Sequence, residues 1–145
     1  MRTARQLLLA FLEQVQQPEV THELFADDGI YEAPYLESLG MPWRYRGRIE
    51  VAQHLDAVCG LFPQLTFHDV VIVAETLECV VAEYEFTTRS SRTGRMIHQL
   101  IVGRLESADG QIMLLRESLD LVELALALYR RGLADERIPS DRDAW

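Results

Sequence analysis

The sequence contains no lysine and no asparagine, and only two of its 145 residues are cysteines. Its 14 basic residues are therefore all arginines, set against 23 acidic residues, for a net charge of −9. Nucleic acids and anionic membranes bind through basic patches, so we expect neither as a partner. Cys59 and Cys79 are too few for a metal cluster or a disulfide scaffold. We expect two reduced thiols, with one disulfide as the alternative.

Long apolar runs and common catalytic motifs are also missing. No stretch approaches the roughly 18 apolar residues of a membrane-spanning helix. The apolar run at residues 7–12 is followed by Glu13 and lacks the cleavage site of a signal peptide. There is no Gly-rich phosphate loop and no HExxH, CxxC or GxSxG motif, which disfavours nucleotide-binding, zinc-hydrolase and serine-hydrolase functions. We expect a cytoplasmic protein that uses no cofactor and no metal.

Hydrophobic residues make up 48% of the chain, enough to build a core for one domain of this length. Apolar residues at helical spacing predict helices over residues 4–16, 18–25, 48–62 and 120–131. Residues 27–29 read as a turn and residues 34–47 as an irregular aromatic segment. Alternation predicts strands over 30–33, 65–74, 80–87, 97–105 and 111–119, with hairpin turns at 90–94 and 109–110. We predict a single domain over residues 1–133, followed by a polar, mobile tail over 134–145.

The order of these elements predicts an α+β fold. Helices come first, then antiparallel strands joined by hairpins, then a closing helix, which favours a curved sheet covered by helices on one face. The strand at 97–105 is apolar on both faces, with Ile97 and Ile101 on one and Leu100 and Val102 on the other. A sheet face that is not covered by helices is normally polar. We therefore predict a symmetric homodimer joined through the outer face of the sheet.

Two titratable residues stand on apolar faces of predicted elements. His54 falls on the core-facing stripe of the helix at 48–62, where it is either a packed core histidine or a proton shuttle near neutral pH. Glu117 shares a strand face with Met113, Leu115 and Leu119. Burial there would raise its pKa and suit it to acid–base chemistry. The alternative is a rim glutamate paired with an arginine.

Four short stretches, in order, resemble one family. They are His22-Glu23-Leu24-Phe25 before Asp28-Gly29, Arg46-Gly47 before Ala52-x-His54, Phe62-Pro63, and Asp109-Gly110-x-Ile112 before Arg116-Glu117. Together they resemble the SnoaL-like group of the ketosteroid-isomerase-like (nuclear-transport-factor-like) superfamily, and most of all its phenazine biosynthesis A/B proteins. The resemblance spans about residues 20–130. It implies a conical α+β barrel with a mostly antiparallel sheet wrapped around N-terminal helices, a deep pocket, and a homodimer formed through the sheet.

The resemblance also assigns site residues. It implies that Glu117 and His54 are the acid–base groups. The family's carboxylate-binding arginine corresponds to Thr21, and a serine one turn after the family's histidine corresponds to Val58. Because both replacements remove polar groups, we expect a neutral or weakly polar ligand, unless Arg44, Arg46 or Arg48 supplies the missing charge. We expect Thr21, Tyr45, Val58, Tyr84 and His98 to contact the substrate.

The sequence therefore favours an acid–base enzyme of the isomerase, cyclase or condensation type. Its expected substrate is a small cyclic ketone-like intermediate of secondary metabolism, and its reaction needs only proton transfer and confinement. The alternative is a module of the same fold that binds a small ligand, or dimerises, without catalysis.

Overall fold

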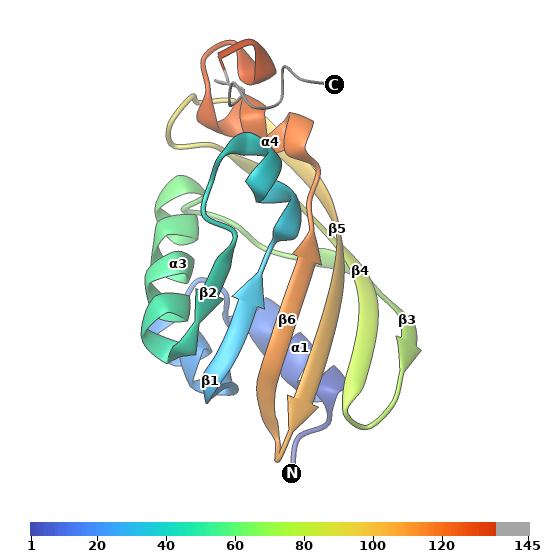
Figure 1. Ribbon diagram of the computed structural model, residues 1–145. Helices are drawn as coiled ribbons and strands as arrows, with labels where there is room; N and C mark the ends of the chain where they lie inside the picture. The colour runs from blue at the N-terminus through green and yellow to red at the C-terminus, as the bar shows by residue number, and fades with distance from the viewer. Residues whose placement is uncertain (136–145) are drawn as a thin grey trace, which may run out of the picture.

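The computed structural model describes residues 1–135. Its centre is a curved, unclosed sheet of six strands in the order β2-β1-β6-β5-β4-β3 (Figure 1). Of the strand pairs within residues 1–135, the β1–β6 pair is parallel, and the other four are antiparallel. The predicted α+β class and mostly antiparallel sheet are confirmed. The predicted tail at 134–145 lies, apart from residues 134 and 135, outside the described residues.

Helix α1 (Ala4–Gln14) fills the concave side of the sheet. It begins at Thr3, whose side chain accepts a hydrogen bond from the Gln6 backbone while the Gln6 side chain accepts one from the Thr3 backbone. This reciprocal cap satisfies donors that a helix start otherwise leaves free. Leu7, Leu8 and Phe11 are fully buried, and the helix contacts β4, β5 and β6. These contacts build the core beneath the sheet.

The second predicted helix, over 18–25, is shorter than expected. Helix α2 (Pro18–Thr21) is followed by the 3₁₀ helix η1 (His22–Leu24), and strand β1 (Phe25–Glu32) begins directly after it. The turn predicted at 27–29 is wrong, because β1 runs through these residues with an irregular register against β6. A Cβ on Gly29 would lie 2.5 Å from the Ile112 carbonyl oxygen. Glycine therefore permits a close backbone approach within the strand.

The segment expected to be irregular contains the 3₁₀ helix η2 (Pro34–Leu39) and the edge strand β2 (Arg44–Arg46). Gly40 ends η2 in the left-handed conformation, with a φ of 67°. Helix α3 (Gly47–Leu61) follows β2 at once and packs against β1. In Figure 1, α3 stands beside the β2 edge of the sheet, and α4 closes its upper end.

Four hairpin-connected strands and the closing helix complete the fold. Strands β3 (His68–Glu75), β4 (Cys79–Arg89), β5 (Met96–Ala108) and β6 (Gln111–Ser118) follow one another along the chain. Helix α4 (Leu121–Leu128) is capped by the Asp120 side chain, and the backbone turns extended at Tyr129. The helix therefore ends three residues before the predicted end at 131. None of the described helices is long and apolar enough to cross a membrane.

Candidate active site

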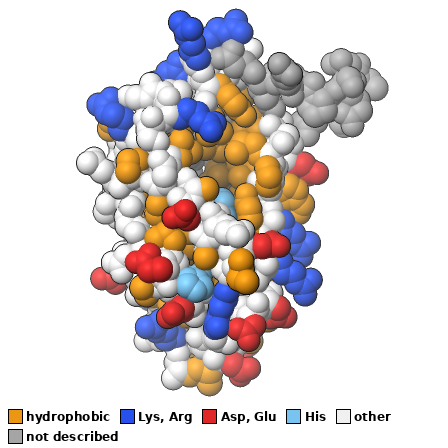
Figure 2. Space-filling model, turned by 90° about the vertical axis from the view of Figure 1, so that its left-hand side faces the viewer, with side chains coloured by type: hydrophobic (Ala, Val, Ile, Leu, Met, Phe, Trp, Pro, Cys, Tyr) orange, Lys and Arg blue, Asp and Glu red, His pale blue; other side chains and the backbone are white. Residues whose placement is uncertain are grey.

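A cavity of about 300 Å³ lies between the concave face of the sheet and helices α1, α3 and α4. Its walls are mainly apolar, with Phe11, Leu55, Phe62, Phe86 and Ile101 among them. Figure 2 shows hydrophobic side chains gathered around a hollow in this side of the molecule. Few polar groups reach such a space, so each one determines what it can bind.

Glu117 of β6 is the carboxyl group of this cavity and is 5% exposed. The Tyr31 hydroxyl donates to its Oε1 at 2.5 Å, and the Tyr84 hydroxyl donates to its Oε2. Burial raises the pKa of Glu117, and the two tyrosine hydrogen bonds partly oppose that rise. The result is a carboxyl group held in one orientation with a raised pKa, as acid–base chemistry near neutral pH requires.

The tyrosine hydroxyls have their own pKa values raised well above normal, by burial first and then by the neighbouring Glu117. They therefore stay protonated and donate to the carboxylate. Tyr84 reaches Glu117 across β5 because Gly103 lies between them. A Cβ on Gly103 would come within 2.8 Å of the Tyr84 ring, and Gly103 pairs directly with Glu117 in the β5–β6 register.

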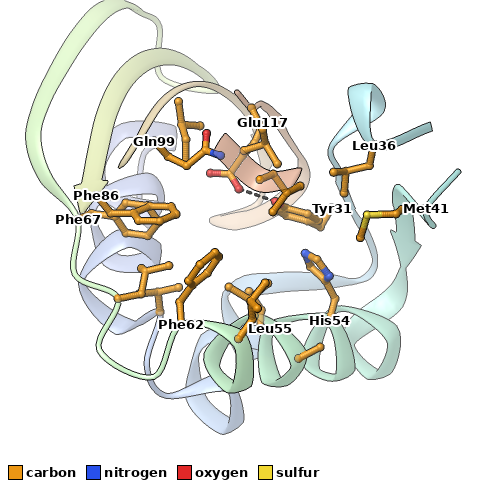
Figure 3. Close-up of a pocket in the computed structure, with 18 of the residues that line it drawn as sticks. Tyr31, Leu36, Met41, His54, Leu55, Phe62, Phe67, Phe86, Gln99 and Glu117 are labelled. Atoms are coloured by element: carbon orange, nitrogen blue, oxygen red, sulfur yellow. Dashed lines mark hydrogen bonds between the residues drawn. The ribbon is translucent and has the colours of Figure 1, made fainter. Parts of the chain in front are cut away.

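His54 projects from α3 into the cavity opposite Tyr31 (Figure 3). Its ring stacks on Tyr45 with a centroid distance of 4.1 Å and an interplanar angle of 18°. The ring of Tyr31 lies 4.6 Å away on a tilted plane. Burial lowers the pKa of His54 to about 4, so the imidazole is neutral at pH 7. A neutral imidazole can accept a proton on one ring nitrogen and donate from the other.

Gln99 is a buried polar group of the cavity that the sequence did not single out. Its amide nitrogen donates to the Asp120 carbonyl at 2.8 Å, and its amide oxygen accepts from the Asp120 backbone nitrogen at 2.9 Å. Both ends of the amide are thus used to hold the chain where α4 begins. Gln99 therefore positions α4 over the cavity, with its polar atoms already paired.

The structure places the other predicted contact residues in different surroundings. Tyr45 and Val58 line the cavity. Tyr84 touches it only through Glu117. Thr21 is fully buried away from the cavity, and its hydroxyl donates to the Gln14 and Gln17 carbonyls. That hydroxyl joins α1 to α2 and does not face the ligand space.

His98 also lies away from the cavity. It lies on the outer face of β5 and pairs with Glu85 at 2.8 Å. The alternation of β5 explains this, since His98 shares its face with Leu100 and Val102 while Ile97 and Gln99 point inward. Of the predicted contacts, His98 and Thr21 therefore do not belong to this cavity.

One cluster of side chains among residues 1–135 has groups suited to a metal ion. Ligand atoms of His68, Asp69 and Glu85 all lie within 4.8 Å of one another. All three side chains are partly exposed, and His68 already pairs with Asp69 at 2.7 Å. None of them lines the cavity. Within residues 1–135, this cluster therefore lies apart from Glu117 and His54.

The SnoaL-like domain family matches residues 6–115 of the sequence. This chain belongs to that family. No curated protein matches it. One similar solved structure is a candidate isomerase from Bacillus subtilis, at 18% identity over 94% of this chain and 96% of the other, with a TM-score of 0.75. Another is a phenazine biosynthesis-related protein from Pseudomonas aeruginosa, at 17% identity over 94% of this chain and 88% of the other, with a TM-score of 0.73.

A SnoaL-like polyketide cyclase from Agrobacterium tumefaciens is similar at 17% identity, over 86% of this chain and 96% of the other, with a TM-score of 0.66. At these identities the similarity to solved structures shows the fold alone. The family membership and the ketosteroid-isomerase-like fold that the sequence resembles are both confirmed.

Proposed function

We propose that this SnoaL-like protein is an acid–base enzyme of the isomerase, cyclase or condensation type that needs no cofactor. Its substrate would be a small, largely apolar cyclic ketone-like intermediate of secondary metabolism. The observation that carries this proposal is the Glu117 carboxyl group, buried at an apolar cavity and held by two tyrosine hydroxyls. Burying a carboxyl group costs free energy. Buried groups with shifted pKa values are often found at functional sites, where they transfer protons.

Glu117 would take a proton from the carbon beside the substrate carbonyl and return it at another position. The carbonyl oxygen gains negative charge when that proton leaves, so it needs a hydrogen-bond donor. His54, neutral and facing the same cavity, would donate from one ring nitrogen or relay the proton. The stack with Tyr45 and Tyr31 supports this role because it fixes the plane of the imidazole.

The apolar walls would supply the remaining part of the catalysis. They exclude water from the carboxyl group and hold a ring against it, which favours reactions limited by proton transfer and orientation. General acid–base help of this kind contributes about 10²–10⁴-fold. Substrates that already react slowly without help therefore fit best.

Exchange of ketone protons with solvent tests this role directly. Cyclohex-2-enone in D₂O would be followed by proton NMR with the wild-type protein and with Glu117→Gln. We expect the protein-dependent exchange rate to fall at least ~10²-fold in the variant. Glu32→Gln is the matched control, because Glu32 is also buried but is paired with Arg116 at 2.6 Å. Equal exchange rates for wild type and Glu117→Gln would contradict the catalytic role.

A binding module without catalysis is the second candidate. The replacement of the family's polar groups by Thr21 and Val58 favours it, and so does the placement of Thr21 outside the cavity. In that case Glu117 would orient a ligand by a hydrogen bond and no proton would move. Calorimetry showing ligand binding that depends on Glu117, together with no exchange above the buffer rate, would identify this function.

We also propose that two copies join through the outer face of the sheet in a cytoplasmic homodimer. Exposed apolar side chains support this assembly, because Val71, Leu100 and Val102 lie on that face. Leu100 and Val102 lie next to each other on this face of β5, and neighbouring exposed apolar side chains are often covered by a partner. The free thiols of Cys59 and Cys79 support a reducing compartment.

A further inference from the structure

The tip of the β4–β5 hairpin carries a charged residue at the mouth of the cavity. Arg92 lines the cavity and is exposed at its surface. Among the described residues that line the cavity, Arg92 is the one cationic side chain, since His54 is neutral at pH 7. The cavity therefore has a carboxyl group at its floor and a guanidinium at its opening.

The hairpin that carries Arg92 is firmly attached to two helices. Ser90 donates to the Ala127 carbonyl at 2.6 Å, and Arg95 donates to the Leu126 and Tyr129 carbonyls at 2.9 and 2.8 Å. Ser91 donates to the Gly60 carbonyl at 2.7 Å. These bonds join the hairpin to the C-terminal ends of α3 and α4, so its tip is held in a fixed position over the opening.

Arg92 is used differently from its neighbours. The side chains of Ser90, Ser91, Thr93 and Arg95 all bond to helix carbonyls. The Arg92 guanidinium has no hydrogen bond or ion pair to any group within residues 1–135. An arginine presents five N–H donors in a planar fork that matches a carboxylate or a similar anion. This guanidinium is therefore available to a ligand.

Arg44 and Arg48, two of the three arginines considered from the sequence, have partners outside the cavity. Arg44 lies 3.7 Å from the Glu32 carboxylate, and Arg48 pairs with Asp27 at 2.9 Å and donates to the Phe25 carbonyl. None of Arg44, Arg46 and Arg48 lines the cavity. This segment therefore supplies no charge to the cavity, and within residues 1–135 Arg92 is the one arginine on the cavity wall.

We propose that Arg92 binds an anionic group of the ligand, so that the substrate is a cyclic ketone that carries an acid. The ring would occupy the apolar cavity, the carbonyl would meet Glu117 and His54, and the acid would remain at the opening beside Arg92. This inference rests on the proposed function and narrows its substrate class. An acidic substrate differs from the neutral ligand expected from Thr21 and Val58. The positive charge of Arg92 comes from the β4–β5 hairpin, which lies far from both residues in the sequence.

A pair of fluorescent probes tests Arg92 independently of catalysis. 1-Anilinonaphthalene-8-sulfonate carries an anionic group, and N-phenyl-1-naphthylamine has the same ring system without it. We expect Arg92→Gln to weaken binding of the sulfonate about tenfold and to leave the amine within about twofold. The wild-type preference for the sulfonate should shrink as salt is raised, since the opening is exposed to solvent.

Arg104→Gln is the matched control, because it removes the same charge from the outer face, where Arg104 pairs with Glu106. Equal loss of sulfonate binding in Arg92→Gln and Arg104→Gln would overturn the proposal, as would no loss in Arg92→Gln. The proposed function is tested separately, because it fails if wild type and Glu117→Gln exchange ketone protons at equal rates. The last measurement is the exchange of ketone protons with solvent in 4-oxocyclohex-2-ene-1-carboxylate, with the wild-type protein and with Arg92→Gln. Arg92→Gln should raise KM for this acid at least fivefold more than for its methyl ester.

Discussion

The hydroxyl of Tyr31 and the carboxyl group of Glu117 are joined by a 2.5 Å hydrogen bond between two neighbouring strands, β1 and β6. The same tyrosine ring lies against His54. Tyr31 therefore contacts both candidate acid–base groups at once. It holds the carboxyl group by its hydroxyl and the imidazole by its ring, so the spacing of the two groups is set by one rigid side chain.

Removal of either tyrosine hydroxyl should change how Glu117 titrates. Both hydrogen bonds favour the carboxylate and lower its pKa against the effect of burial. Tyr31→Phe and Tyr84→Phe should therefore raise the pKa of Glu117 further, and the acidic limb of the exchange rate should move to higher pH in both. Tyr35→Phe, at a side chain 56% exposed, is the control and should leave the profile unchanged. A limb that stays in place, or moves to lower pH, would contradict this coupling.

Burial of His54 should make stability depend on pH. Its pKa falls from an ordinary 6.5 to about 4, so between these values the unfolded chain binds a proton that the folded chain does not. The free energy of unfolding should thus decrease as pH falls from about 6.5 to 4, by up to about 3 kcal/mol from this group. Urea titrations of wild type and His54→Gln should show a difference that shrinks or reverses over this range. His68→Gln, at an exposed histidine, is the control. Parallel stability curves for wild type and His54→Gln would count against a lowered pKa.

Burial of Glu117 should act in the opposite sense. Its folded pKa is raised, so the folded chain holds a proton that the unfolded chain releases. Its contribution to stability is complete below the ordinary pKa of 4.5 and is lost as pH rises through the folded pKa. Glu117→Gln should remove this loss, and its free energy of unfolding should fall less than that of wild type between pH 5 and 8. A steeper fall in the variant would show that the pKa is not raised.

Much of the architecture follows from periodicity. The apolar stripe of residues 48–62 and the alternation of 80–87 and 97–105 predict α3, β4 and β5. The same alternation places His98 on one face with Leu100 and Val102, and the structure shows that this face is the outer one. Local patterns assign a side chain to a face of its own strand, and the sheet then decides which face is inside.

Other features depend on distant contacts and leave little local signal. Strand β1 continues through Asp27, Asp28 and Gly29, although this triplet has typical turn chemistry, because the pairs with β6 at Phe25 and Ile30 hold the strand on both sides of the register shift. Arg92 reaches the cavity only because the hairpin tip is attached to α3 and α4. Neither relationship lies within a single periodic segment, so neither follows from the sequence alone.

The outer face of the sheet should control assembly. Val71, Glu83, Val102 and Ser118 form one row across β3, β4, β5 and β6 on that face. We expect light scattering at micromolar concentration to give twice the 16.6 kDa mass of one chain. Val102→Glu should shift the protein toward the monomer, since it replaces an exposed apolar side chain by a second carboxylate beside Glu83. Val122→Glu, at an exposed valine on α4, is the control. A wild-type mass of one chain would exclude the dimer.

Gly103 should be required for the hydrogen bond between Tyr84 and Glu117. A Cβ there meets the Tyr84 ring at 2.8 Å, and in a packed core such a contact costs about 1–3 kcal/mol. Gly103→Ala should therefore lower the free energy of unfolding by that amount. It should also move the acidic limb of the exchange rate to higher pH, as Tyr84→Phe does. Gly60→Ala is the matched control, since a Cβ at Gly60 of α3 meets nothing within 4 Å. It should stabilise the helix by roughly 0.5–1 kcal/mol. If Gly103→Ala were as stable as wild type and kept its pH profile, Tyr84 would not need the space above Gly103 to reach the carboxyl group.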